Sequence, residues 1–354
     1  MQRRRSRKVH IGETPMGGNA RISVQTMTRS PIERIDASLE EIRAAHALGC
    51  DIVRLAVPNA ASAPFFGRIA ARSPVPLVAD THFDWRTTVA AIREGAAKIR
   101  INPGNMSPDG LARVVDAAGE KGIPIRIGGN SGSIFHRNGN EGGMPLPDAM
   151  AEELLLWAGQ MEDMGFHDIV LSLKTNDAAG TVRANRIAAA RSDYPLHLGV
   201  TAAGPKSESL LKSAAALGSL LLDGIGDTIR FSFTGDMPGE VEAGRELLRS
   251  LGLGKRGVSI VSCPACGRCR VALADLVGQV RARLAHIEAP LQVAVMGCEV
   301  NGPGEAKAAD CGIASAGGVM YLFIAGNVVD KVEKDSAVDR LVMEAERLAA
   351  DRSR

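Results

Sequence analysis

Short β-rich runs alternate with alanine-rich stretches eight times in the first 251 residues, and this alternation constrains the fold more than any other feature. The β-rich runs cover residues 22–26, 51–57, 76–80, 98–102, 124–128, 168–174, 195–201 and 227–233. The stretches that follow them predict helices near residues 36–48, 61–72, 86–95, 109–120, 148–164, 177–191, 206–222 and 237–251. Alternating strands and helices are typical of parallel βαβ units. Eight such units in about 240 residues match the size of a TIM barrel.

The rival fold is a doubly wound open sheet, which normally carries a glycine-rich phosphate loop after its first strand. The sequence has no such loop there. We therefore predict an α/β protein whose residues 1–252 form a TIM (β/α)8 barrel that holds the substrate.

The pattern changes after a glycine-rich linker at residues 252–257. The later sequence predicts a strand at 258–261, a helix at 270–287, a strand at 291–296, a strand or hairpin near 319–332 and a last helix near 336–350. This order predicts a small α+β domain over residues 258–354, in which cysteine-bearing segments leave the ends of two strands.

Composition excludes two classes of partner. The formal net charge of the 354-residue chain is only +2, so no general nucleic-acid footprint is present. Apolar runs fall short of the roughly 20 residues of a membrane span, and the basic start is not followed by a signal-peptide core. We therefore expect a cytoplasmic protein without a membrane or nucleic-acid partner. In such a reducing compartment, clustered cysteines are metal ligands or redox groups more often than disulfides.

Three predicted strands carry an arginine between apolar residues. These are Arg54, Arg100 and Arg126, and Lys174 ends a fourth strand. Buried cations are costly without anionic partners, and guanidinium groups match phosphate oxygens. The pattern favours a small substrate that bears a phosphate or diphosphate. Internal ion pairs with aspartates such as Asp51 and Asp80 are the alternative.

Two glycine-rich segments follow the fourth and fifth strands at the same rim. They contain Asn102 and Asn130, whose amide groups and neighbouring backbone N–H groups can also bind an anion.

Five of the six cysteines lie after residue 260. Cys263, Cys266 and Cys298 suit three ligands of a [4Fe–4S] cluster with an unusual fourth ligand, and spacing alone allows Cys269 to be that ligand. A zinc site or a redox dithiol is the alternative, although zinc normally has a second Cys/His pair. We expect Cys50 to be a small buried residue on the first helix, and Cys311 to serve packing.

Several motifs together resemble one family over residues 9–333. They are Gln25-Thr26-Met27, Asp80-Thr81-His82-Phe83, Arg100-Ile101-Asn102-Pro103-Gly104-Asn105, Ile125-Arg126-Ile127-Gly128, Cys263-Pro264-Ala265-Cys266 and Asn301-Gly302-Pro303-Gly304-Glu305-Ala306. In this combination the chain is similar to the 4-hydroxy-3-methylbut-2-enyl diphosphate synthases of the methylerythritol phosphate route to isoprenoids.

The resemblance implies a TIM barrel followed by a ferredoxin-sulfite-reductase-like domain with a [4Fe–4S] cluster. It implies reductive ring opening of 2-C-methyl-D-erythritol 2,4-cyclodiphosphate, with loss of a hydroxyl as water, in a homodimer that receives electrons from reduced flavodoxin or ferredoxin. By the resemblance, the cluster ligands are Cys263, Cys266, Cys298 and Glu305. The implied substrate ligands are Arg54, Arg100, Asn102, Arg126, Asn130 and Lys174.

The resemblance also implies a catalytic role for Glu305. A carboxylate binds iron more weakly than a thiolate does, so Glu305 can give way to a substrate oxygen.

Two residues depart from the family pattern. Ala202 stands where the family has a glutamate near the substrate, and Cys269 is a thiol that the family does not typically have. The first departure keeps open a homologue that binds a diphosphate but is slow, inactive or altered in substrate. A zinc-stabilised TIM-barrel lyase or aldolase, with a Schiff base on Lys174, is the other alternative.

Overall fold

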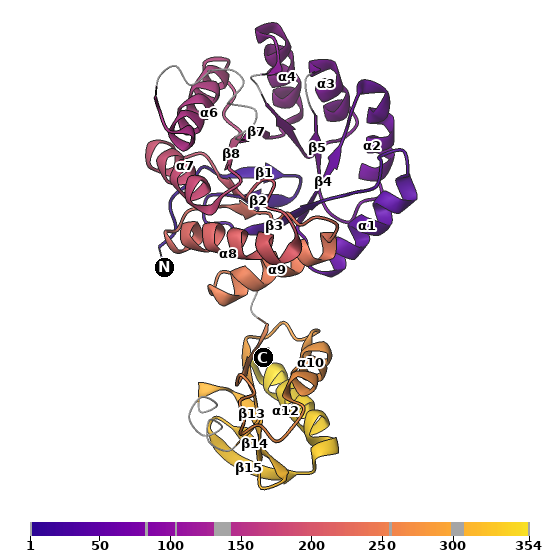
Figure 1. Ribbon diagram of the computed structural model, residues 1–354. Helices are drawn as coiled ribbons and strands as arrows, with labels where there is room; N and C mark the ends of the chain where they lie inside the picture. Colours follow the sequence, from indigo (N-terminus) through magenta and orange to yellow (C-terminus); the bar gives the residue numbers. More distant parts are fainter. Residues whose placement is uncertain are drawn as a thin grey trace. The chain divides into compact units, whose positions relative to one another are not determined.

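The computed structural model describes residues 2–81, 84–102, 105–130, 143–254, 257–298 and 308–352, with the side chain of Asn130 excepted. The chain forms two compact units, Met1–Gly254 and Lys255–Arg354 (Figure 1). Each unit has its own hydrophobic core and is described separately.

The first unit is built on eight parallel strands. They are β3 (Ser23–Met27), β4 (Ile52–Ala56), β5 (Leu77–Asp80), β6 (Lys98–Ile101), β7 (Ile125–Asn130), β8 (Ile169–Lys174), β9 (His197–Leu198) and β10 (Thr228–Ile229). Their order is β8-β7-β6-β5-β4-β3-β10-β9, and a parallel bridge between Leu171 and Leu196 joins the two ends. The sheet therefore closes as a barrel, which confirms the predicted fold and excludes the open sheet.

Helices surround these strands on the outside (Figure 1). They are α1 (Ile35–Ala47), α2 (Ala63–Ala70), α3 (Trp85–Arg93), α4 (Pro108–Lys121), α6 (Leu146–Asp163), α7 (Ala178–Arg191), α8 (Lys206–Leu222) and α9 (Met237–Ser250). Four of them begin after a side chain that accepts a backbone N–H bond, the capping residues being Asp84, Ser107, Asp177 and Asp236. These four caps fix where their helices start, and thereby where the loops before these helices end.

A short hairpin at the start of the chain was not predicted. It consists of β1 (Val9–Ile11) and β2 (Thr14–Met16), paired antiparallel. Val9, Ile11 and Met16 pack in one cluster with residues near the beginnings of three barrel strands, namely Ile52, Val78 and Val170. The hairpin therefore closes the apolar end of the barrel and leaves the opposite, C-terminal strand ends for a site.

Over its described residues, the second unit is a five-stranded sheet with two α-helices. Its strands are β11 (Val258–Ser262), β12 (Leu291–Met296), β13 (Cys311–Ala316), β14 (Val319–Ile324) and β15 (Asn327–Val332), in that order in the sheet. Its helices are α10 (Leu273–Leu284) and α12 (Ala337–Arg352). β11, β12 and β13 run parallel, and β14 and β15 continue as antiparallel neighbours. β13 lies in the middle of the sheet and was missed in the sequence.

Candidate functional site

The strand register of the barrel brings the predicted cations to one end. Arg100 pairs in register with Asp80 on one side and with Arg126 on the other, while Arg54 pairs with Val78. A cavity of about 200 Å³ lies at these strand ends. Its lining residues are Arg54, Asp80, Arg100, Arg126, Gly128, Ser172, Lys174, Val200, Thr201, Ala202, Arg230 and Ser232. Among them, five side chains are cationic and one is a carboxylate.

That carboxylate belongs to Asp80 and lies between two of the arginines. It is 3.4 Å from Nη1 of Arg100 and 3.6 Å from Nε of Arg54. The ion-pair alternative thus holds for these two arginines. It is wrong for Asp51, whose carboxylate pairs with Arg21 and Arg245 instead.

Arg126 and Lys174 are buried at the same cavity without a carboxylate contact within 4 Å among the residues that the structure describes. Nη1 of Arg126 donates to the Ser172 hydroxyl at 3.2 Å, whereas its Nε and Nη2 have no partner in this part of the chain. Burial, and then the nearby arginines, lower the pKa of Arg126 well below its ordinary value. A buried cation in this state gains most from an anionic ligand.

Lys174 instead lies 3.2 Å from a histidine, with Nζ facing Nε2 of His197. Burial and the charge of Arg126 lower the pKa of Lys174 well below its ordinary value. Burial also lowers the pKa of His197, and the charge of Lys174 adds to the effect. The imidazole is therefore neutral at physiological pH and can accept from the lysine.

Arg230 lines the cavity but was not predicted as a ligand. It lies 3.4 Å from the carboxylate of Glu240, and burial lowers its pKa to about 10. The signal was present in the sequence, because Ile229-Arg230-Phe231 repeats the pattern of an arginine between apolar residues.

The structure does not place the two predicted asparagine ligands among the described residues that line the cavity. Asn102 directly follows β6 but is not among the residues that line the cavity. Asn130 is the last residue of β7, and its side chain lies outside the described part of the structure.

Ala202 lines the cavity in a left-handed backbone conformation, with φ of +48°. A methyl group therefore stands at the cavity wall where the resemblance leads one to expect a carboxylate.

The cysteine-bearing segments of the second unit follow two neighbouring strands, at the same end of the sheet. Ser262 pairs in parallel register with Val295, so Cys263 after β11 and Cys298 after β12 emerge at the same end of the sheet. The backbone N–H of Gly297 donates to Sγ of Cys263 at 3.3 Å. Arg270 donates its N–H to the carbonyl of Gly297 at 3.1 Å and so ties the loop after β11 to this point.

Cys269 also packs here, because a Cβ at Gly297 would collide with its Sγ. Its thiol donates to the Val271 carbonyl at 3.3 Å. Cys266 is exposed in the same loop, and Cys269 N–H donates to its carbonyl at 2.8 Å.

Thiols thus gather beside Gly297, a donor chemistry that fits an iron–sulfur group. Over the described ranges, however, no group of three or more His, Cys, Asp or Glu side chains is arranged to hold a metal ion. Glu305 lies outside the described residues.

The remaining cysteines are buried packing residues. Cys311 lies in β13 within the core of the second unit, and burial raises the pKa of its thiol to about 12. Cys50 is buried as expected, but it follows α1 in the loop before β4 and is not on the helix. Burial raises the pKa of its thiol to about 12 as well.

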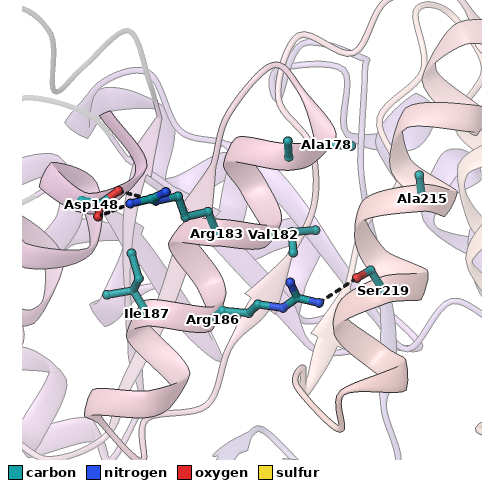
Figure 2. A pocket seen from close by; sticks show the side chains of 9 residues that line it. Asp148, Ala178, Val182, Arg183, Arg186, Ile187, Ala215 and Ser219 are labelled. Carbon is teal, nitrogen blue, oxygen red and sulfur yellow. Dashed lines mark hydrogen bonds and ion pairs between the residues drawn. The ribbon is translucent and has the colours of Figure 1, made fainter. Parts of the chain in front are cut away.

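A wider hollow of about 740 Å³ lies on the outside of the barrel along α7, between residues of α6 and α8 (Figure 2). Its two arginines are engaged with neighbours. Arg183 contacts the Asp148 carboxylate at 2.6 and 2.8 Å. Arg186 contacts Asp223 at 2.8 Å and the Ser219 hydroxyl at 3.2 Å. The buried cavity, with its unpaired nitrogens, is therefore the stronger candidate for an anion site.

Fold and site together define a class: a TIM barrel whose strand ends enclose a small cationic cavity, followed by a separate unit that gathers thiols at one sheet edge. Within this class the chain belongs to the GcpE family. Residues 6–245 match the GcpE TIM-barrel domain, and residues 259–347 match the GcpE protein C-terminal domain.

Two curated relatives illustrate the likeness, both named 4-hydroxy-3-methylbut-2-en-1-yl diphosphate synthase (flavodoxin). The protein of Corynebacterium diphtheriae is 47% identical over 349 residues, which cover 98% of this chain and 89% of the relative. That of Caldanaerobacter subterraneus subsp. tengcongensis is 44% identical over 350 residues, which cover 99% of each chain.

Solved structures support the barrel fold. The dihydropteroate synthase of Stenotrophomonas maltophilia matches with a TM-score of 0.53 and 17% identity, over 70% of this chain and 98% of that one. At this identity the likeness concerns the fold alone. Among the described helices, none is both long enough and apolar enough to cross a membrane.

Proposed function

We propose that this protein is a 4-hydroxy-3-methylbut-2-en-1-yl diphosphate synthase. It opens the ring of 2-C-methyl-D-erythritol 2,4-cyclodiphosphate reductively and releases (E)-4-hydroxy-3-methylbut-2-enyl diphosphate and water. The names of the full-length relatives support this activity. The observation that carries it to this chain is the pair of buried basic side chains, Arg126 and Lys174, for which a diphosphate is the fitting partner.

The barrel residues bind and orient the substrate. Arg54 and Arg100 are held by Asp80, so their guanidinium groups are already placed before the ligand arrives. Arg126 and Lys174 supply donors from the adjacent strands β7 and β8. Fixing both phosphates in this way holds the carbon skeleton in one orientation at the cavity mouth. Asn102 and Asn130 belong to the same proposal as ligands at the rim.

The second unit supplies the redox group. Cys263, Cys266, Cys298 and Glu305 would hold a [4Fe–4S] cluster, which when bound provides single electrons and a Lewis-acidic iron. Glu305 is the catalytic ligand of the proposal, because a carboxylate is the ligand most easily displaced from iron. Gly297 supports the site by donating to Cys263 and by leaving room for Cys269.

The proposal includes a homodimer, reduced flavodoxin or ferredoxin as electron donor, and a cytoplasmic location. A reducing compartment suits the thiols, since all six cysteines are free in the structure.

Iron and sulfide analysis of anaerobically purified protein tests the proposal against a zinc-containing barrel. We expect about four irons and four sulfides per chain together with visible thiolate-to-iron absorption. Stoichiometric zinc without sulfide would contradict the proposal. Borohydride trapping of a carbonyl substrate on Lys174 would point to the aldolase instead.

A further inference from the structure

Two residues of the neighbouring strand segment, His197 and Gly199, hold the Lys174 side chain in place, and we call this pair the seat of Lys174. Its Nζ lies 3.2 Å from Nε2 of His197 in β9. Gly199 follows β9 and makes room for the lysine, because a Cβ at Gly199 would stand 2.7 Å from Nζ and 2.9 Å from the Arg230 carbonyl. A strand glycine of this kind marks a close approach that any side chain would block.

The neighbouring charges that act most strongly on Lys174 are all positive. Those that bear on Lys174 are Arg126 from β7, Arg230 after β10, Arg54 from β4 and Arg100 from β6. Lys98 from β6 is a further cation that bears on His197. The carboxylates of the neighbourhood are engaged elsewhere: Asp80 contacts Arg54 and Arg100, and Glu240 contacts Arg29 and Arg230.

Before a ligand is bound, burial and then the surrounding cations lower the pKa of Lys174 and so disfavour a proton on it. A ligand anion in the cavity favours a proton on Lys174, because it adds negative charge beside Nζ. His197 can accept one N–H bond from the amine in either state, while its own Nδ1 has no partner among the described residues.

From this geometry we infer that His197 and Gly199 are positioning residues for Lys174, and that anion binding in the cavity is coupled to the uptake of a proton at the Lys174–His197 pair. The inference rests on the proposed function in so far as the cavity must bind a phosphorylated ligand. In this account, the Lys174–His197 pair takes up its proton when the ligand binds, before the ring-opening reaction begins.

Isothermal titration of the intact protein measures the coupling. Sulfate and pyrophosphate are titrated separately at about pH 8.5, in two buffers that differ in ionisation enthalpy and contain no phosphate. Sulfate carries no proton at this pH, so any proton taken up with it belongs to the protein. We expect net proton uptake with sulfate, and its loss in Lys174→Met. Binding of sulfate without proton uptake would overturn the inference and leave the proposed function intact. Failure of both anions to bind would count against the proposed function itself.

Variants of the seat test the positioning role. Gly199→Ala is expected to weaken pyrophosphate binding about 10-fold or more, because the methyl displaces Nζ from the cavity. Gly159→Ala is the matched control, since a Cβ there meets nothing within 4 Å. His197→Leu is expected to weaken binding, and His197→Gln, which keeps an acceptor, to restore most of it. Equal affinities for the two His197 variants, or for the two glycine variants, would contradict the positioning role.

Discussion

Arg126 donates a hydrogen bond of 3.2 Å from Nη1 to the hydroxyl of Ser172, and in the described part of the chain this is the one hydrogen bond of its buried guanidinium. The other two nitrogens, Nε and Nη2, have no partner among the residues that the structure describes. The free protein thus holds a costly charge that a bound diphosphate would compensate.

Arg126→Met is therefore expected to stabilise the free protein and to abolish its response to ligand. Even a buried ion pair can often be replaced by apolar side chains of similar volume with a gain of about 1–4 kcal/mol, and an unpaired buried cation has no Coulombic attraction to lose. Thermal unfolding with and without pyrophosphate measures both effects, since a ligand at 100 times its Kd stabilises by about 2.7 kcal/mol. Arg72→Met, at an exposed ion pair with Asp36, is the control. An Arg126→Met protein that keeps its full response to pyrophosphate would contradict a cavity site.

Ala202 is expected to be a strained position. Its φ of +48° is unfavourable for a residue with a Cβ. Ala202→Gly should raise the free energy of unfolding by up to about 1 kcal/mol, whereas Ala203→Gly, at a neighbouring buried alanine, should lower it. Chemical denaturation of both variants measures the difference, and equal losses in the two would show that the strain is absent.

Ala202→Glu tests the chemistry of the same position. The new carboxylate would enter a wall that is lined by five cations, which would keep it ionised. We expect turnover to rise severalfold, because an ionised carboxylate at this wall can accept a proton or a hydrogen bond, which the methyl group of Ala202 cannot. An unchanged rate would show that another residue already serves this purpose.

His197 is expected to make the protein sensitive to acid. Its pKa is lowered well below 6.5 in the folded protein, chiefly by burial, so the unfolded chain binds an additional proton below about pH 6.5. The free energy of unfolding should therefore fall as the pH drops, with a contribution of up to about 1.4 kcal/mol per pH unit from this residue. Urea unfolding between about pH 5 and 7 should show a smaller slope for His197→Gln. His46→Gln, at an exposed position of α1, is the control.

Gly297 is expected to be needed for assembly of the iron–sulfur site. A side chain there collides with Sγ of Cys269, so Gly297→Ala should lower the iron content after anaerobic reconstitution. Adding Cys269→Ala should restore it, because the smaller side chain removes the collision. Cys269→Ser alone should keep full iron content. If Cys269→Ser lost the cluster, Cys269 would be a ligand and the assignment of Glu305 would be wrong.

Much of the barrel could be predicted, because its strands carry a repeated signal. Six of the eight strands begin and end close to the predicted residues, whereas β9 and β10 are shorter than predicted, with two residues each. The arginines Arg54, Arg100 and Arg126 do meet at one end. The hairpin was missed because its strands have three residues each, and β13 because Gly312 and Ser315 interrupt its apolar pattern. Short or interrupted runs acquire their structure from packing that the local sequence does not display.

The seat of Lys174 could not be predicted for a different reason. His197 lies in an apolar run and reads as an ordinary strand residue, and its contact with Lys174 exists only because the barrel closes between β8 and β9. Arg230, by contrast, had the same local signal as the three predicted arginines.

Turnover of the cyclodiphosphate tests the central claim most directly. Anaerobic protein with its cluster reconstituted is supplied with reduced flavodoxin and 2-C-methyl-D-erythritol 2,4-cyclodiphosphate, and the product is quantified by chromatography. The account predicts (E)-4-hydroxy-3-methylbut-2-enyl diphosphate from the intact protein and a loss of about 100-fold or more in kcat/KM for Arg126→Met. No product from iron-loaded protein, under conditions where the Corynebacterium diphtheriae relative turns over, would contradict the account.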